Sequence, residues 1–363
     1  MSLFPEEQLD SPAGYFAAKP GQTPDKKRWT IVRKLGWGPR SSTWLAFDNG
    51  QERHGQYGAI KILTVAATED GTGANELDIF LGPMQNVRRG VPELLGHFYE
   101  RNPFRRQRHL CFVFGVLGPS VEDLRLSKDF PGQCLPLHVV QKVIGDVSER
   151  LVSVGHHNKV VHGAVTADNF LVETARDIRD VLAESPNESV KTILGSDGIL
   201  YPSVKSQPID HDHKWDTLAE DIMHAQIYLN NYAHASRIAK AVQLYLPKHL
   251  LPPEALQGEK IDIKSDIWML GCTTYHLLTG EQLFSEAYVN SPVETATETL
   301  KNLQHILDNS NKIEKKDIPA TASFLRSCLA IKPSQRPNAV KFLKGDWVRT
   351  SCSCEWHDYN SDY

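Results

Sequence analysis

Residues 162–169 read His-Gly-Ala-Val-Thr-Ala-Asp-Asn, and the apolar tripeptide Phe-Leu-Val follows them. This stretch says more about the fold than any other in the chain. It opens with a histidine and closes with an asparagine, whose amide oxygen can bind a cation. At its centre stands Ala164, and a methyl group can neither accept a proton nor orient a hydroxyl. The stretch therefore has polar residues at both ends and no acid–base group at position 164.

Several segments ahead of this stretch form an ordered series. Residues 35–45 read LGWGPRSSTWL, in which Gly36 and Gly38 allow the backbone to approach phosphate groups without a Cβ in the way. The tripeptide Ala-Ile-Lys then ends at Lys61, and the segment NELDIFL contains Glu76. Each segment alone is weak evidence for a fold, but their order along the chain makes a chance match improbable.

The series continues towards the C-terminus. Residues 111–118, CFVFGVLG, form an apolar strand pattern that ends in glycine. Apolar residues recur at helical spacing from 136 to 157, which predicts an amphipathic helix before His162. Glu254 follows a proline, and Arg336 precedes one. Helices are also predicted at 264–279, 293–309, 319–330 and 337–344.

Taken in this order, the segments resemble the motifs of protein kinases over roughly residues 28 to 348. The opening LGWG…S.TWLA, the apolar CFVFGVLG and a long insert after Asn169 resemble most closely the SR-protein kinase family and its fungal relatives. The resemblance implies an α+β, two-lobed protein kinase-like fold with a small β-rich N-lobe and a larger helical C-lobe. The implied parts are a polar N-terminal arm (1–27), an N-lobe (28–116), a C-lobe (117–348) and a C-terminal tail (349–363).

The resemblance also implies roles for single residues. Lys61 corresponds to the strand lysine that pairs with nucleotide phosphates, and Glu76 to its ion-pair partner. A purely structural ion pair between them is the alternative. Phe114 corresponds to the gatekeeper at the back of the adenine pocket, and Glu254 to the partner of Arg336. The implied cofactor-binding residues are Gly36, Gly38, Lys61, Glu76 and Asn169.

Two departures from the kinase pattern weaken the implied chemistry. Ala164 stands where kinases have the Asp that receives the substrate hydroxyl proton. In residues 225–235, AQIYLNNYAHA, Asn231 replaces the Asp of the D-F-G triplet. A carboxamide oxygen is a poorer ligand than a carboxylate for a hard cation. We therefore expect no metal site, weak ATP binding at most with little dependence on magnesium, and no assigned catalytic residue.

The insert at about residues 174–222 is polar and has prolines and glycines spread along it, which predicts an irregular loop. SR-protein kinases carry a spacer at this same point. Within the insert, the run Asp-His-Asp-His at 210–213 has metal-ligand residue types, but a solvated loop is the favoured interpretation.

The stretch from Arg88 to Arg108 concentrates positive charge in a slightly acidic chain and interleaves it with aromatic residues. A solvated loop between strands is one interpretation. The other is a face that binds phosphates, because arginines and aromatics together combine charge with stacking. Its members would be Arg101, Arg105, Arg106 and Arg108, and tRNA would be the nucleic acid concerned.

Composition limits the other possibilities. The net charge of −4 at pH 7 gives no general case for nucleic acid or membrane binding. No run of 18 apolar residues occurs, so we expect no transmembrane helix, and the acidic start does not resemble a secretory signal. Four single cysteines in apolar or helical patterns predict reduced thiols, and Cys352 and Cys354 lack a second metal-spaced pair. We expect a cytoplasmic protein, with a nuclear one as the alternative.

Three hypotheses follow for function. The first is a pseudokinase that works as a scaffold or allosteric partner of an unidentified protein, because two carboxylates of phosphoryl transfer are missing. The second is a residual ATP-binding Ser/Thr kinase, since Lys61, Glu76 and Asn169 are retained. The third is a kinase fold reused for another reaction, such as fungal aminoacyl-tRNA-dependent cyclodipeptide synthesis. Whether the chain is an enzyme stays open at this point.

Overall fold

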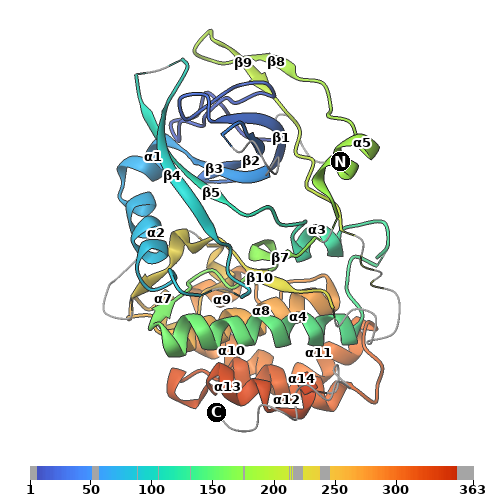
Figure 1. The fold of residues 1–363 in the computed structure, drawn as a ribbon. Helices are drawn as coiled ribbons and strands as arrows, with labels where there is room; N and C mark the ends of the chain where they lie inside the picture. The colour runs from blue at the N-terminus through green and yellow to red at the C-terminus, as the bar shows by residue number, and fades with distance from the viewer. Residues whose placement is uncertain are drawn as a thin grey trace. The chain divides into compact units, whose positions relative to one another are not determined.

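The computed structural model describes residues 6–50, 57–87, 89–104, 106–130, 132–174, 176–211, 213, 215, 224–237 and 246–349. The chain divides into two compact units, and each unit is built from several chain segments (Figure 1). The first comprises Met1–Leu81, Pro92–Pro119 and Glu173–Asp212. The second comprises Gly82–Val91, Ser120–Val172 and His213–Tyr363.

The first unit is built on an antiparallel sheet of five strands in the order β1-β2-β3-β5-β4. Alternating side chains of β1 and β2, such as Ile31 and Trp44, are buried on one face and form the core with Ile60 and Val113. Two helices follow β3, and Thr64 caps the first of them. The elements are β1 (Trp29–Gly38), β2 (Ser41–Asp48), β3 (Tyr57–Leu63), α1 (Val65–Glu69), α2 (Thr72–Leu81), β4 (Leu94–Arg101) and β5 (Arg108–Phe114).

The N-terminal segment is not the polar arm expected for residues 1–27. Its charged residues surround a short apolar run, Tyr15-Phe-Ala-Ala18, and this run is buried in the first unit. Phe16 and Ala18 join the core of the sheet, while Tyr15 packs with Leu9 in a smaller cluster. The apolar run is too short to show helical or strand periodicity, so the sequence pattern hides its burial.

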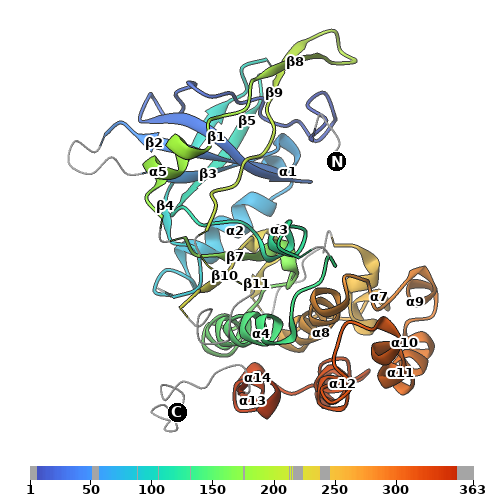
Figure 2. The ribbon, with the colours of Figure 1, turned by 90° about the vertical axis from the view of Figure 1, so that its right-hand side faces the viewer.

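The insert forms regular elements instead of the irregular loop expected for residues 174–222, and residues 173–212 belong to the first unit. Asp177 caps α5 (Ile178–Glu184), and Gly198, with φ of +76°, turns β8 (Lys191–Leu194) into β9 (Leu200–Ser203) (Figure 2). The prolines and glycines therefore mark turns between short elements. Asp212 and most of 214–222 lie outside the described residues.

The second unit is largely helical, and helices occur near all the predicted ranges, although the one expected at 293–309 is divided at Asn302 into two. The helix expected at 136–157 is α4 (Leu137–Leu151), continued by a π-helical turn at Val152–His157. The helix expected at 264–279 is α8 (Ile263–Thr279), which is almost wholly buried. Asp262 and Ser265 form a capping box at its start, and Gly280 ends it in the left-handed conformation.

The remaining helices of this unit are short. They are α3 (Val121–Arg125), α7 (Pro253–Leu256), α9 (Glu286–Asn290), α10 (Pro292–Lys301), α11 (Leu303–Ser310), α12 (Ile318–Cys328), α13 (Ala339–Leu343) and α14 (Asp346–Arg349). Two small antiparallel pairs complete the unit: β6 (Val160–Val161) with β11 (Ser236–Arg237), and β7 (Phe170–Val172) with β10 (Ile227–Leu229). The stretch 162–169 is the connection between β6 and β7. Among the described residues, no helix is long and apolar enough to cross a membrane.

Candidate functional site

Lys61 and Glu76 form the ion pair that the sequence implied. Lys61 lies on β3 and Glu76 on α2, and the ammonium nitrogen is 2.7 and 2.9 Å from the two carboxylate oxygens. Glu76 is almost completely buried. A carboxylate in that position needs a charged or hydrogen-bonded partner, and Lys61 supplies both. The geometry suits either role considered for the pair, nucleotide binding or structural support.

Gly36 and Gly38 lie at the end of β1, beside the turn to β2. Among the described residues, nothing lies within 4 Å of the position that a Cβ would take at either glycine. The backbone is therefore accessible there to a ligand that must approach closely. Phe114, at the end of β5, packs against Phe80 of α2 with ring centroids 5.1 Å apart. The expected gatekeeper is thus in contact with the helix that carries Glu76.

Helix α8 binds the backbone of the stretch 162–169. Asp266 accepts hydrogen bonds from the backbone N–H groups of His162 and Gly163, both at 2.8 Å. Burial raises the pKa of Asp266 to about 7, against the opposing effect of these two donors. His162 contacts the carbonyl oxygen of Asn230 at 3.0 Å and packs edge-on against Tyr232. His162 therefore has the packing and hydrogen-bonding role of a structural residue in this loop.

Ala164 is completely buried, and its methyl group is the only side chain at the position of the kinase base. Asn169 donates to the carbonyl oxygen of Ala164 at 2.9 Å and to the hydroxyl of Thr166 at 3.1 Å. These two hydrogen bonds link the end of the loop to its middle. The conformation of the loop is maintained by these hydrogen bonds from the Asn169 side chain.

Asn169 and Asn231 lie side by side, as the implied alignment requires. The side chain of Asn231 donates to the amide oxygen of Asn169 at 3.1 Å. Asn231 has φ of +65°, a left-handed conformation that asparagine tolerates better than most residues. A divalent cation prefers carboxylates, and here it would meet two neutral amides that already bind each other. These two residues do not fit a magnesium ion.

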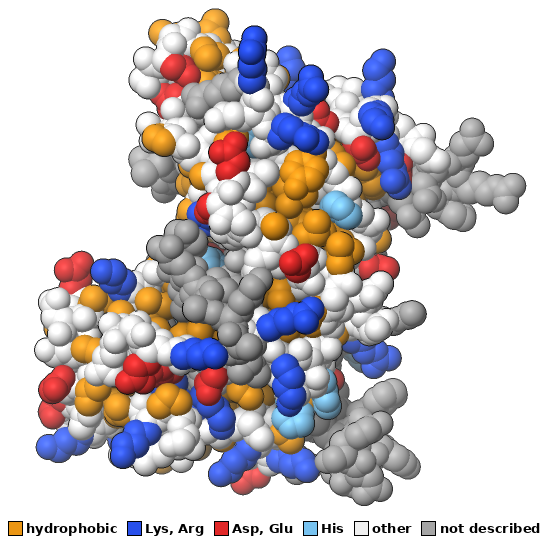
Figure 3. All heavy atoms as spheres, turned by 90° about the vertical axis from the view of Figure 1, so that its left-hand side faces the viewer, with side chains coloured by type: hydrophobic (Ala, Val, Ile, Leu, Met, Phe, Trp, Pro, Cys, Tyr) orange, Lys and Arg blue, Asp and Glu red, His pale blue; other side chains and the backbone are white. Residues whose placement is uncertain are grey.

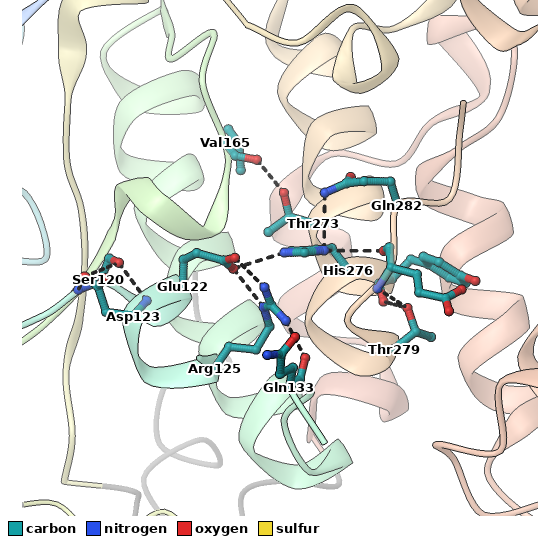
Figure 4. Close-up of polar contacts among 12 residues, drawn as sticks. Ser120, Glu122, Asp123, Arg125, Gln133, Val165, Thr273, His276, Thr279 and Gln282 are labelled. Atoms are coloured by element: carbon teal, nitrogen blue, oxygen red, sulfur yellow. Dashed lines mark hydrogen bonds and ion pairs between the residues drawn. The ribbon is translucent and has the colours of Figure 1, made fainter. Parts of the chain in front are cut away.

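Sequence reasoning missed a polar network between α3 and α8 (Figure 4). Glu122 accepts from Arg125 at 2.9 Å and contacts His276 of α8 at 3.0 Å. Burial raises the pKa of Glu122, but the hydrogen bonds from Arg125 and His276 outweigh it and lower the pKa to about 2. On the same helix α8, Thr273 donates to the carbonyl oxygen of Val165 at 2.8 Å. The network thus joins α8 to both α3 and the 162–169 loop.

Asp168 is an exposed carboxylate in the same loop, and the sequence analysis did not single it out. Partial burial of its carboxyl group, followed by the charges of Glu122 and Asp123, raises its pKa.

The pattern Ser120-x-x-Asp123 is a capping box, and this signal could have located α3 in the sequence. No group of three or more metal-ligating side chains is found in the part of the chain that the structure describes.

Arg336 and Glu254 form the pair implied by the sequence. The guanidinium makes two hydrogen bonds to the carboxylate, at 2.6 and 2.8 Å, and both side chains are buried. Arg336 also donates to three backbone carbonyl oxygens and lies 5.0 Å from the ring centroid of Trp268. This pair joins α7 to the loop before α13.

The arginine stretch is divided between the two units. Arg89 belongs to the second unit, whereas Arg101, Arg106 and Arg108 belong to the first. Arg101 and Arg108 are directly opposite each other on β4 and β5, and the guanidinium of Arg108 lies 4.7 Å from the ring centroid of Tyr99. Arg88 and Arg105 lie outside the described residues.

Comparison with known proteins agrees with this architecture. The protein kinase domain family matches residues 222–348. The serine/threonine-protein kinase SRPK of Physarum polycephalum is 26% identical over 300 residues, covering 75% of this chain and 65% of that protein. Protein kinase dsk1 of Schizosaccharomyces pombe is 27% identical over 168 residues, covering 44% of this chain and 29% of that protein. The match thus spans less than two thirds of either relative.

The solved structures lead to the same fold. The crystal structure of a kinase domain superposes with a TM-score of 0.61 and 17% identity, covering 92% of this chain and 98% of that one. The chain therefore has the two-lobed α+β protein kinase fold, and its relatives are SR-protein-kinase-like. These relatives include proteins of yeasts, a slime mould, nematodes and mammals, so they do not mark the chain as fungal.

Proposed function

We propose that this chain is an SR-protein-kinase-like pseudokinase, without protein phosphotransferase activity, that acts as a scaffold or allosteric partner for another protein. The observation that carries the proposal is Ala164, a fully buried methyl group at the position of the kinase base. A positioned general base contributes about 10²- to 10⁴-fold to such reactions. Its loss alone would make phosphorylation slow.

The Asn169–Asn231 hydrogen bond supports the same conclusion. Kinases depend on metal ions to neutralise the charge on the transferring phosphoryl group. With two neutral amides in place of an amide and a carboxylate, the second unit offers little at this point to hold the metal. Two changes that each remove a different part of the reaction favour a chain that has lost the reaction altogether.

Some nucleotide binding is compatible with this proposal. The Lys61–Glu76 pair is intact, and Gly36 and Gly38 leave the backbone open. These groups bind phosphate without a metal. ATP would then act as a structural ligand that stabilises the first unit, and a protein partner would recognise the stabilised form.

The test is a phosphorylation assay with radiolabelled ATP and an Arg/Ser-rich protein substrate. The wild-type chain should incorporate no more label than a buffer blank. The double variant Ala164→Asp/Asn231→Asp restores both carboxylates, and any activity should appear only there. Lys61→Met in the double variant is the control, since it should abolish that activity. Turnover by the wild-type chain that Lys61→Met removes would instead identify a residual Ser/Thr kinase.

A second candidate function is RNA binding through the first unit. Arg101 and Arg108 face each other across β4 and β5, and like charges in directly opposite positions destabilise a sheet. An anionic partner relieves that repulsion. Tyr99, half exposed, adds a ring on which a base can stack. Such a surface is what a kinase fold reused for an aminoacyl-tRNA-dependent reaction would need.

Neighbouring residues enlarge this basic surface. The backbone N–H of Asp25 donates to the carboxylate of Glu100 at 2.9 Å, which brings the exposed Lys26 and Lys27 next to β4. Figure 3 looks onto the side of the molecule that carries α1, α2 and β4 in Figure 1. It shows several Lys and Arg side chains with hydrophobic side chains on its upper part.

Salt dependence of tRNA binding tests this candidate. Each phosphate contact contributes about 0.7 to 0.9 to the slope of log K against log salt. Replacing Arg101, Arg105, Arg106 and Arg108 with Ala should flatten the slope by about two to four units while the fold persists. The matched control replaces the exposed Lys301, Lys312, Lys315 and Lys316, which changes the net charge equally and should leave the slope unchanged. Equal slopes in both variants, or no binding at low salt, would remove the candidate.

A further inference from the structure

The segment Glu6–Ala18, here called the N-terminal strap, crosses the first unit and is fixed at both ends. At its start, the buried ammonium group of Lys34 pairs with Glu6 at 2.8 Å and with Glu7. Lys34 also donates to the carbonyl oxygen of Val204 in the insert at 3.1 Å. A buried lysine needs such partners, so the strap, β1 and the insert are held together at this point.

The insert contacts the strap at three further places. Glu6 accepts hydrogen bonds from the backbone N–H and the hydroxyl of Ser206, at 2.9 and 2.6 Å. Asp10 accepts one from the backbone N–H of Ser196 at 2.7 Å. Leu9 and Tyr15 of the strap pack in one apolar cluster with Tyr201 of β9.

The other end of the strap is fixed to α1. The carbonyl oxygens of Ala13 and Gly14 accept from the first backbone N–H groups of α1, those of Ala66 and Val65, at 3.1 and 2.9 Å. Gly14 has φ of +69°, and a Cβ there would lie 3.0 Å from the side chain of Val65. Glycine is therefore required for this close approach.

Tyr15, directly after Gly14, contacts the glycine-rich turn. Its hydroxyl donates to the carbonyl oxygen of Gly38 at 2.8 Å, and its ring lies edge-on to Trp37 with centroids 6.5 Å apart. Burial, with a smaller effect of Glu7, raises the pKa of Tyr15 to about 12. The hydroxyl therefore stays protonated near neutral pH and remains a donor.

The turn is fixed on one side by contacts of Arg40. The carbonyl oxygen of Arg40 accepts from the backbone N–H of Thr64 at 2.8 Å, and its guanidinium donates to the hydroxyl of Thr72 at 2.9 Å. On the other side, a Cβ at Gly36 or Gly38 would meet no described atom outside the neighbouring residues within 4 Å, and the indole of Trp37 is half exposed. This side can open locally unless another segment fixes it. Tyr15 is placed to do so, because it is itself fixed by the strap, the insert and α1.

We infer that Tyr15 is a positioning residue: through the N-terminal strap, it holds the glycine-rich turn of residues 36–41 in one conformation. The insert and the strap then stabilise the turn together, and loss of the contacts of either one should increase local opening of the turn. The inference concerns the first unit alone. It stands whether or not that unit binds nucleotide, so it can fail or succeed independently of the proposed pseudokinase function.

Hydrogen–deuterium exchange of the full chain tests the inference. Tyr15→Phe removes one hydroxyl and should speed exchange in peptides covering residues 35–43 by about five-fold or more, with little change in the overall unfolding midpoint. The matched control is Tyr288→Phe in the second unit. There the buried Tyr288 hydroxyl donates to the carbonyl oxygen of Leu251 at 2.6 Å, so the same chemical group is lost elsewhere. The control should leave residues 35–43 unchanged.

A second variant tests the coupling from the other side. Trp37→Ala changes a half-exposed residue and should leave the fold intact, but it should speed exchange in residues 9–17 of the strap. Coupling between two segments acts in both directions, so a substitution in either segment must change the exchange rate of the other. Unchanged exchange of the turn in Tyr15→Phe, or of the strap in Trp37→Ala, would overturn the inference. Faster turn exchange in both Tyr15→Phe and Tyr288→Phe would also overturn it, because the effect would then be general.

Discussion

The side chain of Asn231 donates to the amide oxygen of Asn169 across 3.1 Å, so the two residues that correspond to the metal-binding positions of kinases bind each other. In kinases, the residues at these positions hold magnesium against the nucleotide. Here the amide oxygen of Asn169 accepts from Asn231, and the amide nitrogen of Asn169 donates to Ala164 and Thr166. The consequence is that nucleotide binding and magnesium binding should be separate properties of this chain.

The first prediction follows from that separation. Millimolar ATP should raise the thermal unfolding midpoint by the same small amount in magnesium and in EDTA, because the first unit can bind phosphates without the metal. Asn231→Asp supplies a carboxylate and should make the shift larger in magnesium than in EDTA. A large shift of the wild-type chain that needs magnesium would show that another carboxylate binds the ion.

The second prediction concerns the buried pair of Arg336 and Glu254. Arg336→Met leaves the Glu254 carboxylate buried without its partner and should lower the free energy of unfolding by about 3 to 5 kcal/mol. The double variant Arg336→Met/Glu254→Met removes both charges and should recover much of that loss. Urea unfolding of the three proteins measures the difference. Equal losses in the single and double variants would mean that packing, and not charge, decides the effect.

The third prediction concerns pH and Glu122. Its folded-state pKa of about 2 lies below the ordinary value of 4.5, so its contribution to stability is complete above pH 4.5 or so and is lost as pH falls towards 2. Glu122→Gln lacks this contribution. The stability difference between wild type and variant should shrink by about 1 kcal/mol between pH 7 and pH 4, and by about 3 kcal/mol in total at lower pH.

Denaturant unfolding at a series of pH values checks the sign of that effect. Thr297→Ala is a suitable control, because Thr297 is exposed on α10 of the same unit as Glu122 and has no titratable group. Its difference from wild type should stay nearly constant over the same range. A Glu122→Gln difference that grows as pH falls would contradict the low pKa of Glu122.

The fourth prediction concerns Gly90, whose φ is +67°. A Cβ there would lie 1.7 Å from Nε of Arg150, and the carbonyl oxygen of Gly90 accepts from the backbone N–H of Leu229 at 2.8 Å. Gly90→Ala should therefore destabilise the second unit by more than about 2 kcal/mol, from backbone strain and a steric clash together. Gly71, with φ of +87° and nothing described within 4 Å of a Cβ, is the matched control. Gly71→Ala should cost only about 1 kcal/mol, from strain alone.

The kinase fold could be predicted because its signals are local. The helices at 264–279 and 136–157 have long apolar patterns, and the structure has them at nearly the same bounds. The Lys61–Glu76 pair followed from the resemblance to kinase motifs, and the structure forms it. Patterns of this length survive in a single sequence without any knowledge of tertiary contacts.

The strap and the insert could not be predicted in the same way. Arg33 donates to the side chain of Asn187 at 2.8 Å, and these residues are 154 positions apart. The elements of the insert, α5, β8 and β9, are only four to seven residues long, too short for a reliable periodic pattern. The α3–α8 network was missed for the same reason, since Glu122 and His276 are also 154 positions apart.

The way the first unit is assembled from the sequence has a consequence for its synthesis. Its strands β1 to β5 are complete once residue 114 has been made, yet Arg33 and Lys34 then lack Asn187 and Val204. Domains generally fold as units while the chain emerges from the ribosome. Here the sheet must wait for about ninety more residues before Arg33 meets Asn187 and Lys34 meets the carbonyl oxygen of Val204, and α4 of the second unit emerges meanwhile. The first unit should therefore reach its native state only after part of the second unit has been made.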